Sequence, residues 1–454
     1  MGYYGRAVIY SDLAYIDESN VVDALYKAIP TFQKNQTQIK WLYNYFKGNQ
    51  PILNRVKEIR PEINNMVVEN HANEIVTFKT GYLIGEPIQY INYGQTVVSE
   101  DLNLLNRYMN AEHKPTRDAE LANWFHICGT SYRMALPDGN ADRDEAPFEI
   151  YTLDPQETFV VYSNSIGHRP LMGVYVTMVR NVPHYHVYTD RAKYEIVNRK
   201  VVDRRDHILG MIPIIEYPLN NERIGAFEIV IPLLNAINTT ASNRLDGIEQ
   251  FVQALFVLKG VEIEDEDFQR VKKLGGIKIP KEGDIDYLVQ ELNQMETQTL
   301  VDYMYQTVLV IVGMPNRNGG SSTSDTGAAT IMRDGWQSAE ARAKLTETTF
   351  DESEMRFLRL ILNIVNPYRD MDLKLSSIEI KFTRRNYQNL LEKVQALTII
   401  LGSDKIHPKL GFELCGAFTD PEYAYKISAE YYEEQQRKEL AELNEINGVH
   451  TDDV

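Results

Sequence analysis

The chain has 454 residues, of which 43% are hydrophobic, and its formal net charge at pH 7 is -17. This length allows two or three domains with a large core, and the apolar content excludes a disordered chain. Acidic residues outnumber basic ones by 64 to 47, which argues against a groove that grips nucleic-acid phosphates. An acidic surface would suit DNA that must pass without adhering, but solubility alone also explains the charge.

The first 80 residues predict helices. Ile39, Leu42, Tyr43 and Phe46 recur at helical spacing, and Gly48 could end that helix. A second helix is predicted over 62–79 behind Pro61, followed by a turn-rich stretch over 81–88. Further helices are predicted over 100–110 and 117–129.

Between residues 131 and 203 the apolar period changes from helical spacing to two. Short alternating runs are separated by Pro-Asp-Gly, Ser-Asn-Ser and Asn-Arg-Lys turn signals. This pattern predicts an antiparallel or mixed sheet, and the fold class of this half is therefore α+β.

The segment 227–259 has the most regular pattern of the chain, with apolar residues at steps of three or four. Pro232 falls in its first turn and Gly260 closes it, which predicts one helix roughly 50 Å long. The insert 261–293 has too few apolar residues for a core of its own, so we expect neighbouring molecules to complete it. A second helix is predicted over 294–313, and Pro315 blocks its continuation.

The segment 316–326 is rich in small residues and predicts an adaptable loop, although a plain linker has the same composition. A long helix over 327–366 follows, with a bend near Gly335 and an end at Pro367. A strand is predicted over 378–382. The chain beyond 386 reads as helical, and 447–454 as a disordered tail.

Motifs that carry catalytic chemistry are absent from the sequence. There is no nucleotide-phosphate loop, no nucleophile elbow and no His-Glu-x-x-His zinc motif. His184 and His186 could share one strand face for a metal, and Asp284 and Asp286 resemble a cation-binding pair. Surface residues and a charged turn are the simpler interpretations. We therefore predict no catalytic residue, metal or cofactor, and no enzyme activity.

The cysteine count and the apolar runs indicate where the protein is made. Cys128 and Cys415 form no metal or redox spacing, so we expect two buried thiols in a reducing compartment. The N-terminus lacks an apolar signal region, and the most apolar run, 308–312, is too short to span a bilayer. We expect synthesis in the cytosol and no membrane partner.

Three segments follow one another in a distinctive order. They are Ile-Pro-Ile-Ile-Glu-Tyr-Pro-Leu-Asn-Asn-Glu-Arg-Ile-Gly-Ala-Phe-Glu at 212–228, the helix 243–260 that ends in Ala-Leu-Phe-Val-Leu-Lys-Gly, and Met-Pro at 314–315 followed by a Gly/Ser loop and Ser-Asp-Thr-Gly-Ala-Ala at 324–329. In this order and spacing they resemble the portal proteins of long-tailed phages that infect Gram-positive bacteria. Upstream, Tyr82 to Ile88 resembles the family's Tyr-x-x-Gly-x-Pro segment. The family often has Ser-Gly before the alanine where this chain has Thr326-Gly327. The likeness runs from about residue 35 to 440.

This resemblance implies a portal fold with an α/β wing, long stem helices, a small α/β clip and a helical crown. By position, 1–225 is wing, 226–260 the first stem helix, 261–293 the clip and 294–313 the second stem helix. The tunnel loop would be 314–326, a wing helix and strand 327–385, and the crown 386–446.

The implied function is a dodecameric ring at a capsid vertex of the virion, assembled in the host cytoplasm, through which double-stranded DNA is packaged and ejected. Its implied partners are the large terminase subunit, head-completion and connector proteins, the major capsid protein and scaffolding protein. The family positions predict two groups of site residues. DNA-facing residues of the tunnel loop would be Asn316, Arg317, Asn318, Gly319, Gly320, Ser321 and Ser322. Docking residues of the clip would be Glu262, Glu264, Asp265, Glu266, Asp267, Arg270, Lys272 and Lys273.

Simpler alternatives stand beside these roles. The acidic run 262–267 also fits a solvated face, and Arg317 could pair with a neighbouring acid rather than contact DNA. For the whole chain, the alternatives are a metal-dependent phage nuclease with scattered carboxylates and another capsid or adaptor protein that assembles by helix packing.

Overall fold

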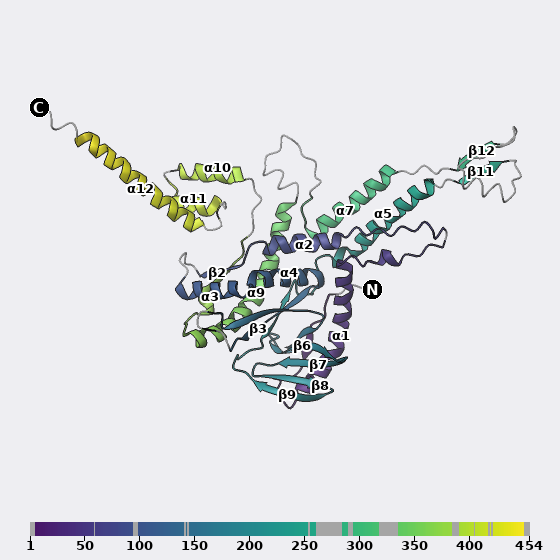
Figure 1. Ribbon diagram of the computed structural model, residues 1–454, viewed down its shortest axis with the longest axis horizontal. Helices are drawn as coiled ribbons and strands as arrows, with labels where there is room; N and C mark the ends of the chain where they lie inside the picture. Colours follow the sequence, from purple (N-terminus) through teal and green to yellow (C-terminus); the bar gives the residue numbers. More distant parts are fainter. Residues whose placement is uncertain are drawn as a thin grey trace. The chain divides into compact units, whose positions relative to one another are not determined.

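The computed structural model describes residues 5–58, 60–93, 99–139, 142, 145–252, 255–259, 284–288, 294–316, 335–383, 390–403, 405–415, 418 and 421–448. The chain divides into two compact units. We call Met1–Tyr43, Glu74–Ile229 and Gly313–Val454 the core unit, and Asn44–Asn73 with Val230–Val312 the hairpin unit. Helices and strands are mixed throughout, which confirms the predicted α+β class (Figure 1).

A six-stranded mixed sheet forms one part of the core unit. Its order is β1 (Ile9–Ser11), β5 (Thr158–Ser163), β6 (Pro170–Val179), β7 (Val182–Tyr188), β8 (Ala192–Val197) and β9 (Lys200–Asp206). Strand β1 runs parallel to β5, and the other pairs are antiparallel. Two tight hairpins place Arg180-Asn181 and Asn198-Arg199 at positive φ, as mirror-image turns require. Apolar residues of α1 (Val21–Phe46) pack with those of this sheet in one cluster.

A second, three-stranded sheet has the order β10 (Ile214–Pro218), β3 (Thr130–Pro137), β4 (Phe148–Leu153). Its apolar residues form one core with α3 (Glu100–Ala111), α4 (Lys114–Cys128) and α9 (Trp336–Arg369). The short pair β2 (Gln89–Asn92) and β13 (Ile378–Lys381) joins the same core. Cys128 and Cys415 are both buried free thiols, as predicted.

Four charged side chains lie inside this core, and no local sequence pattern predicted their burial. Arg133 of β3 contacts Asp118, and its other terminal nitrogen lies 2.9 Å from Glu354 of α9. Lys114 lies 2.6 Å from Asp118 and 2.9 Å from Glu354. All four are at most 2% exposed, so the two cations balance the two carboxylates within the core. We call these four residues the ion cluster.

The hydroxyls of Tyr90 and Tyr217 also donate to Glu354. Burial by itself raises the pKa of Glu354, but the charges of Lys114 and Arg133 and the two tyrosine hydrogen bonds outweigh it and lower that pKa to about 2. The carboxylate is therefore ionised at neutral pH and fixes α9 against β3, β10 and α4.

The hairpin unit contains the helix pair α5 (Ile231–Val252) and α7 (Gln294–Val312), which pack against each other (Figure 1). A 3-10 helix, η1 (Pro51–Asn54), contacts α5. The chain between the two long helices includes the antiparallel pair β11 (Leu255–Lys259) and β12 (Asp284–Leu288). Helices α10 (Leu390–Leu401), α11 (Pro408–Cys415) and α12 (Pro421–Gly448) bear out the helical prediction for the last part of the chain.

Three boundary predictions were wrong. The helix predicted over 227–259 ends at Val252, because Leu255–Lys259 pairs as a strand with β12. The helix predicted over 62–79 begins only at His71 and continues through Gly81 to Ile84, because the backbone before it bonds to α5. Pro367 does not end α9, which closes at Arg369 with Asp370 in the left-handed conformation. That helix begins after Gly335, and 327–334 lies outside the described residues.

Candidate assembly site on the helical hairpin

The segment 212–228 leads the chain towards α5 and is held by buried polar contacts within the core unit. Arg223 donates two hydrogen bonds to Glu216, of 2.6 and 2.9 Å, while Glu228 accepts from Arg6 and from the amide of Gly225. Gly129 has a φ of +79° and approaches so closely that a Cβ there would lie 2.0 Å from the carbonyl oxygen of Arg223. These contacts hold the polar turn against the rest of the core unit.

One face of α5 carries a row of buried polar residues that binds an extended segment of the same unit. Asn238, Ser242 and Asp246 are spaced by four and accept the amides of Glu69, Val67 and Asn65, at 2.8, 3.0 and 2.8 Å. Four helical residues rise about 6 Å, and two extended residues span about 6.6 Å. These two distances are nearly equal, so every second amide of the extended segment lies opposite the next turn of α5. We call 55–70 the strap and the three α5 residues the ladder.

The ladder ends in an ion pair. Asp246 lies 2.9 Å from Lys57 and 3.1 Å from Arg55, and its side chain is 5% exposed. Burial raises its pKa, but hydrogen bonds from Asn65 and Lys57 reverse that effect and leave the pKa below its ordinary value. Asp246 therefore anchors the strap to α5.

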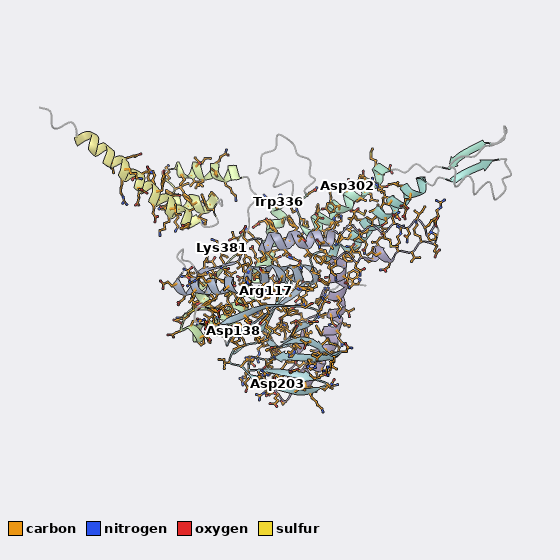
Figure 2. The ribbon with its side chains drawn as sticks, in the orientation of Figure 1. Arg117, Asp138, Asp203, Asp302, Trp336 and Lys381 are labelled. Carbon is orange, nitrogen blue, oxygen red and sulfur yellow. The ribbon has the colours of Figure 1, made fainter. Side chains whose placement is uncertain are left out.

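The predicted apolar stripe of α5 changes from buried to exposed along the helix. Val230, Leu234 and Ile237 are fully buried, whereas Leu245 and Ile248 are 43% and 39% exposed. Where they become exposed, a groove of about 510 Å³ opens between α5, α7 and the strap. Its apolar lining includes Leu245, Ile248, Val301 and Tyr305. Asp302, labelled on α7 in Figure 2, lies at the same groove.

Helix α7 is apolar on two opposite faces. Met304, Val308, Leu309 and Val312 form its buried face. On the other side Leu300, Tyr303 and Val310, spaced by three and seven, are 51%, 67% and 74% exposed. At about 100° per residue these three side chains share one face about 15 Å long. A helix that is apolar all round is normally buried, so this exposed row, which we call the ridge, lacks a partner surface among the described residues.

The structure describes only one of the predicted site residues. Asn316 is half-buried at the end of the segment that follows α7. Arg317 to Ser322 of the predicted tunnel loop, and Glu262 to Lys273 of the predicted docking surface, lie outside the described residues. Neither set is tested by the described geometry, and the ladder and the ridge were not singled out by the sequence reasoning.

The structure places the residues considered as metal ligands in strands and gives the two histidines other partners. Asp284 and Asp286 lie in strand β12 opposite Lys259 and Val257, and not in a turn as expected. His184 lies 2.7 Å from Glu195, and His186 lies 3.0 Å from the hydroxyl of Thr177. Among the described residues no three His, Cys, Asp or Glu side chains gather where they could hold a metal. None of the described helices is long and apolar enough to cross a membrane.

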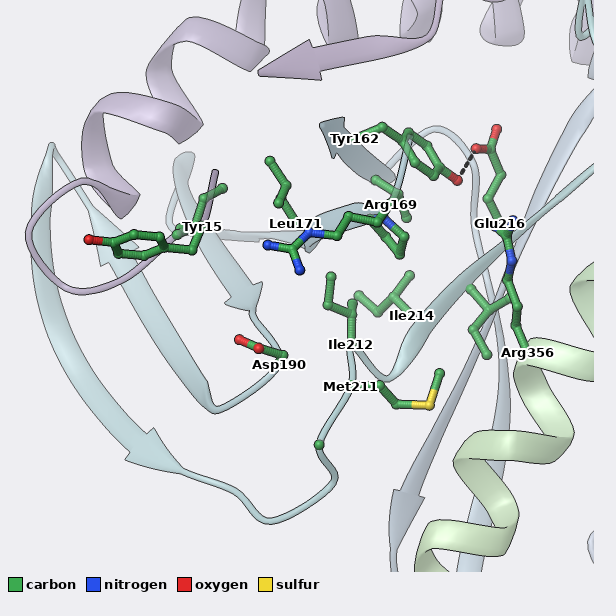
Figure 3. A pocket seen from close by; sticks show the side chains of 15 residues that line it. Tyr15, Tyr162, Arg169, Leu171, Asp190, Met211, Ile212, Ile214, Glu216 and Arg356 are labelled. Carbon is green, nitrogen blue, oxygen red and sulfur yellow. Dashed lines mark hydrogen bonds between the residues drawn. The ribbon is translucent and has the colours of Figure 1, made fainter. Parts of the chain in front are cut away.

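A second cavity, of about 210 Å³, lies in the core unit beside β5 and β10 (Figure 3). Its lining includes the apolar Leu171, Ile212 and Ile214 and the charged Arg169 and Asp190. Tyr162 donates a 2.6 Å hydrogen bond to Glu216, which also lines the cavity. Glu216 also accepts from Thr130 and Arg223. Since this carboxylate already has its partners, we assign it a structural role.

Comparison with known proteins places the chain in a family. Residues 27–447 match the phage portal proteins described as SPP1 Gp6-like, so the chain belongs to this portal protein family. It is 21% identical over 338 residues to the portal protein of Bacillus phage SPP1. That match covers 68% of this chain and 64% of the relative, so the chain spans less than two thirds of the relative's length.

Solved structures with a similar chain path come from the necks of gene transfer agent particles. The neck of an empty particle, computed with C6 symmetry, matches at 12% identity with a TM-score of 0.46. The neck of a native particle, computed with C12 symmetry, matches at 12% identity with a TM-score of 0.45. Each match covers 76% of this chain and 89% of the other.

Proposed function

We propose that this chain is the subunit of a ring of about twelve copies at a capsid vertex of the virion, and that double-stranded DNA enters and leaves through the ring. Membership of the portal family supports this role. In this proposal the protein assembles in the host cytoplasm with scaffolding and major capsid proteins, and it acts as a channel and attachment point and not as an enzyme.

The observation that carries the proposal is the two-sided apolar surface of the hairpin unit. The ridge (Leu300, Tyr303 and Val310) lies on the face of α7 opposite the groove that Val301 and Tyr305 line. A surface that pairs with a different surface on the next copy makes a heterologous contact, and such contacts generate a closed ring when the rotation between copies closes and an open filament when it does not. A ridge from one copy seated in the groove of the next would cover both exposed apolar surfaces.

Electron microscopy and native mass spectrometry of the purified chain test the proposal. We expect rings of about twelve subunits with a central hole. A stable monomer across ionic strengths and protein concentrations would contradict the ring. A closed shell or an open filament without a central hole would favour the alternative of another capsid or adaptor protein.

We propose that the insert 261–293 docks the terminase during packaging and head-completion proteins afterwards. In sequence it carries an acidic run at 262–267 followed by Arg270, Lys272 and Lys273. Reversing the charges of Glu264, Asp265 and Glu266 to lysine should abolish terminase binding in a pull-down while rings still form. Undiminished terminase binding by these rings would assign the acidic run to a solvated face.

We propose that 316–326 faces the DNA, with Arg317 as its contact. Shortening this segment should leave ring assembly intact and reduce the amount of packaged DNA. If the shortened chain forms no rings, the segment has a structural role instead.

The nuclease alternative makes a separate prediction. It requires cleavage of DNA by the purified chain that depends on a divalent cation and is lost when Asp284 and Asp286 become alanine. We expect no cleavage above the level of the double variant.

A further inference from the structure

The cavity beside β5 and β10 is large enough to hold one side chain of another molecule (Figure 3). Its volume of about 210 Å³ exceeds that of an apolar cavity of roughly 150 Å³ that binds benzene. The lining comes from the core unit alone, and none of the lining residues belongs to the ridge, the groove or the segment proposed to face DNA. The proposed ring therefore gives this cavity no role.

The inner part of the lining is apolar. Val160 of β5, Leu171 of β6 and Ile214 of β10 are each at most 6% exposed, and Ile212 just before β10 is also buried. Paired strands of two sheets carry the first three of these side chains, so the cavity is formed before any ligand binds. An aromatic or large aliphatic side chain of a ligand would lose most of its contact with water here, which favours binding.

The buried polar side chains of the lining already have partners. Tyr162 donates its 2.6 Å hydrogen bond to Glu216, and that carboxylate also accepts from Thr130 at 2.8 Å and from Arg223. A polar group of a ligand placed beside them would find its partners taken, and burial of an unpaired polar group is unfavourable. The inner part therefore selects an apolar side chain.

Arg169 lies on the solvent-facing side of the cavity together with Tyr15, which is 65% exposed. Figure 3 shows the side chain of Arg169 extending across the cavity towards Tyr15. Its guanidinium donates a 2.5 Å hydrogen bond to the carbonyl of Ala14 and forms no ion pair with a described carboxylate. A guanidinium has five N–H donors in a planar fork that matches a carboxylate, so Arg169 can bind one in addition to that carbonyl.

The other charged groups on this side of the cavity have partners of opposite charge. Asp190 lies 4.0 Å from Arg191, and Arg356 of α9 lies 2.6 Å from Glu352. Arg169 is therefore the charged side chain of the described lining without an ion-pair partner, and it favours an anionic group on the ligand.

We propose that this cavity binds an extended peptide segment of a partner protein that carries an aromatic or large aliphatic residue two positions from an Asp or Glu. Side chains two positions apart point to the same side of an extended segment. The apolar side chain occupies the inner part of the cavity, and the carboxylate binds Arg169. A single buried anchor of this kind commonly dominates the affinity of an interface.

The test titrates the full chain with blocked tripeptides and follows the methyl NMR signals of Met211, Ile212 and Ile214, which line the cavity. The probes are acetyl-Asp-Ala-Trp-amide and acetyl-Trp-Ala-Asp-amide, so that both chain directions are tested. We expect at least one of them to shift these signals. Replacing its Asp by Asn should weaken binding about fivefold, as for an exposed ion pair. Replacing its Trp by Ala should weaken binding more than about tenfold, because the apolar burial is lost.

Two variants separate the role of Arg169 from a general effect of charge. Arg169→Met should lower the affinity for the Asp peptide to that for the Asn peptide and leave the Asn peptide unchanged. Arg205→Met makes the same change of charge on β9, where the side chain is 76% exposed and outside the lining, and should keep the preference for Asp.

Methyl signals that move with neither peptide would overturn the site, and equal binding of the Asp and Asn peptides would overturn the role of Arg169. Signals that move with protein concentration alone would assign the cavity to a second copy of the chain and overturn the peptide as its occupant. The peptides are expected to bind whether or not rings form, so failure of this site and failure of the ring proposal give separate results.

Discussion

The ion cluster of the core unit and the ridge of the hairpin unit place polar and apolar side chains in opposite environments. The core unit buries a balanced set of charges, with Arg133 and Glu354 fully enclosed. The hairpin unit instead exposes apolar residues, with Tyr303 and Val310 more than half accessible. Buried charges that are paired within the chain need no other molecule, whereas an apolar ridge that faces solvent costs free energy until a partner covers it. The difference indicates that the ion cluster needs no partner molecule and that the ridge is completed by assembly.

The largest effect is expected from a charge placed on the ridge. Tyr303→Glu should weaken each contact between copies by about 3 kcal/mol, more than a hundredfold, since the burial of the aromatic side chain is lost. Native mass spectrometry should then detect monomers in place of rings. Tyr303→Phe is the matched control, because it retains the apolar ring, and it should assemble normally. Intact rings of the Tyr303→Glu chain would remove the ridge from the interface.

The next effect concerns the ion cluster. Arg133→Met leaves two buried carboxylates with Lys114 as their remaining cation, and should lower the free energy of unfolding by about 3–5 kcal/mol. Urea unfolding measures this. The control is Arg356→Met on α9, whose pair with Glu352 is exposed and should contribute less than about 1 kcal/mol. If Arg133→Met and Arg356→Met lower the free energy of unfolding by the same amount, the ion cluster does not stabilise the core unit.

A smaller effect is expected at the ladder. Ser242→Ala removes the acceptor of the Val67 amide and should cost about 1–3 kcal/mol, with faster hydrogen exchange at Val67. Thr240→Ala is the control. The hydroxyls of Ser242 and Thr240 each donate to the carbonyl four residues earlier in α5, but the Thr240 hydroxyl binds no described residue of the strap. Unchanged exchange at Val67 in Ser242→Ala would contradict the ladder.

A further prediction is a dependence of stability on pH. The pKa of Glu354 is about 2 in the folded chain and about 4.5 in the unfolded chain, so its contribution is present above about pH 4.5 and is lost as the pH falls towards 2. Unfolding free energies of the native chain and of Glu354→Gln, measured across this window, should converge as the pH falls. A constant difference would show that the ionised carboxylate is not the stabilising group.

The sequence was sufficient for elements whose signal is local. The alternation over 131–203, with turn signals between runs, predicted the strands from β3 to β9. The helix predicted from the apolar stripe of α5 was correct up to Val252. The next apolar run, Leu-Phe-Val-Leu-Lys at 255–259, has the composition of either a helix or a strand, and only its pairing with 284–288 makes it a strand. Likewise, Ile63, Met66 and Val67 fit a helical face, and only the distant ladder shows that their segment is extended.

The sites were harder to predict because their parts are far apart in sequence. Arg133 and Glu354 are 221 residues apart. Glu354 stands among other charged residues, such as Asp351, Glu352 and Arg356, and nothing local shows that it is the one that pairs with Arg133. The ridge could have been noticed, since Leu300, Tyr303 and Val310 fall outside the buried stripe of α7. A second apolar face on one helix was the available signal for a partner.

Cross-linking between two single-cysteine variants tests the central claim most directly, because Cys128 and Cys415 are buried. Chains carrying Tyr303→Cys on the ridge are mixed with chains carrying Leu245→Cys in the groove, and the assembled rings are oxidised. The account predicts disulfide-linked pairs that contain one chain of each kind, and neither variant cross-linked to itself. Pairs of Tyr303→Cys with Tyr303→Cys, or rings without any cross-link, would contradict a ridge of one copy seated in the groove of the next.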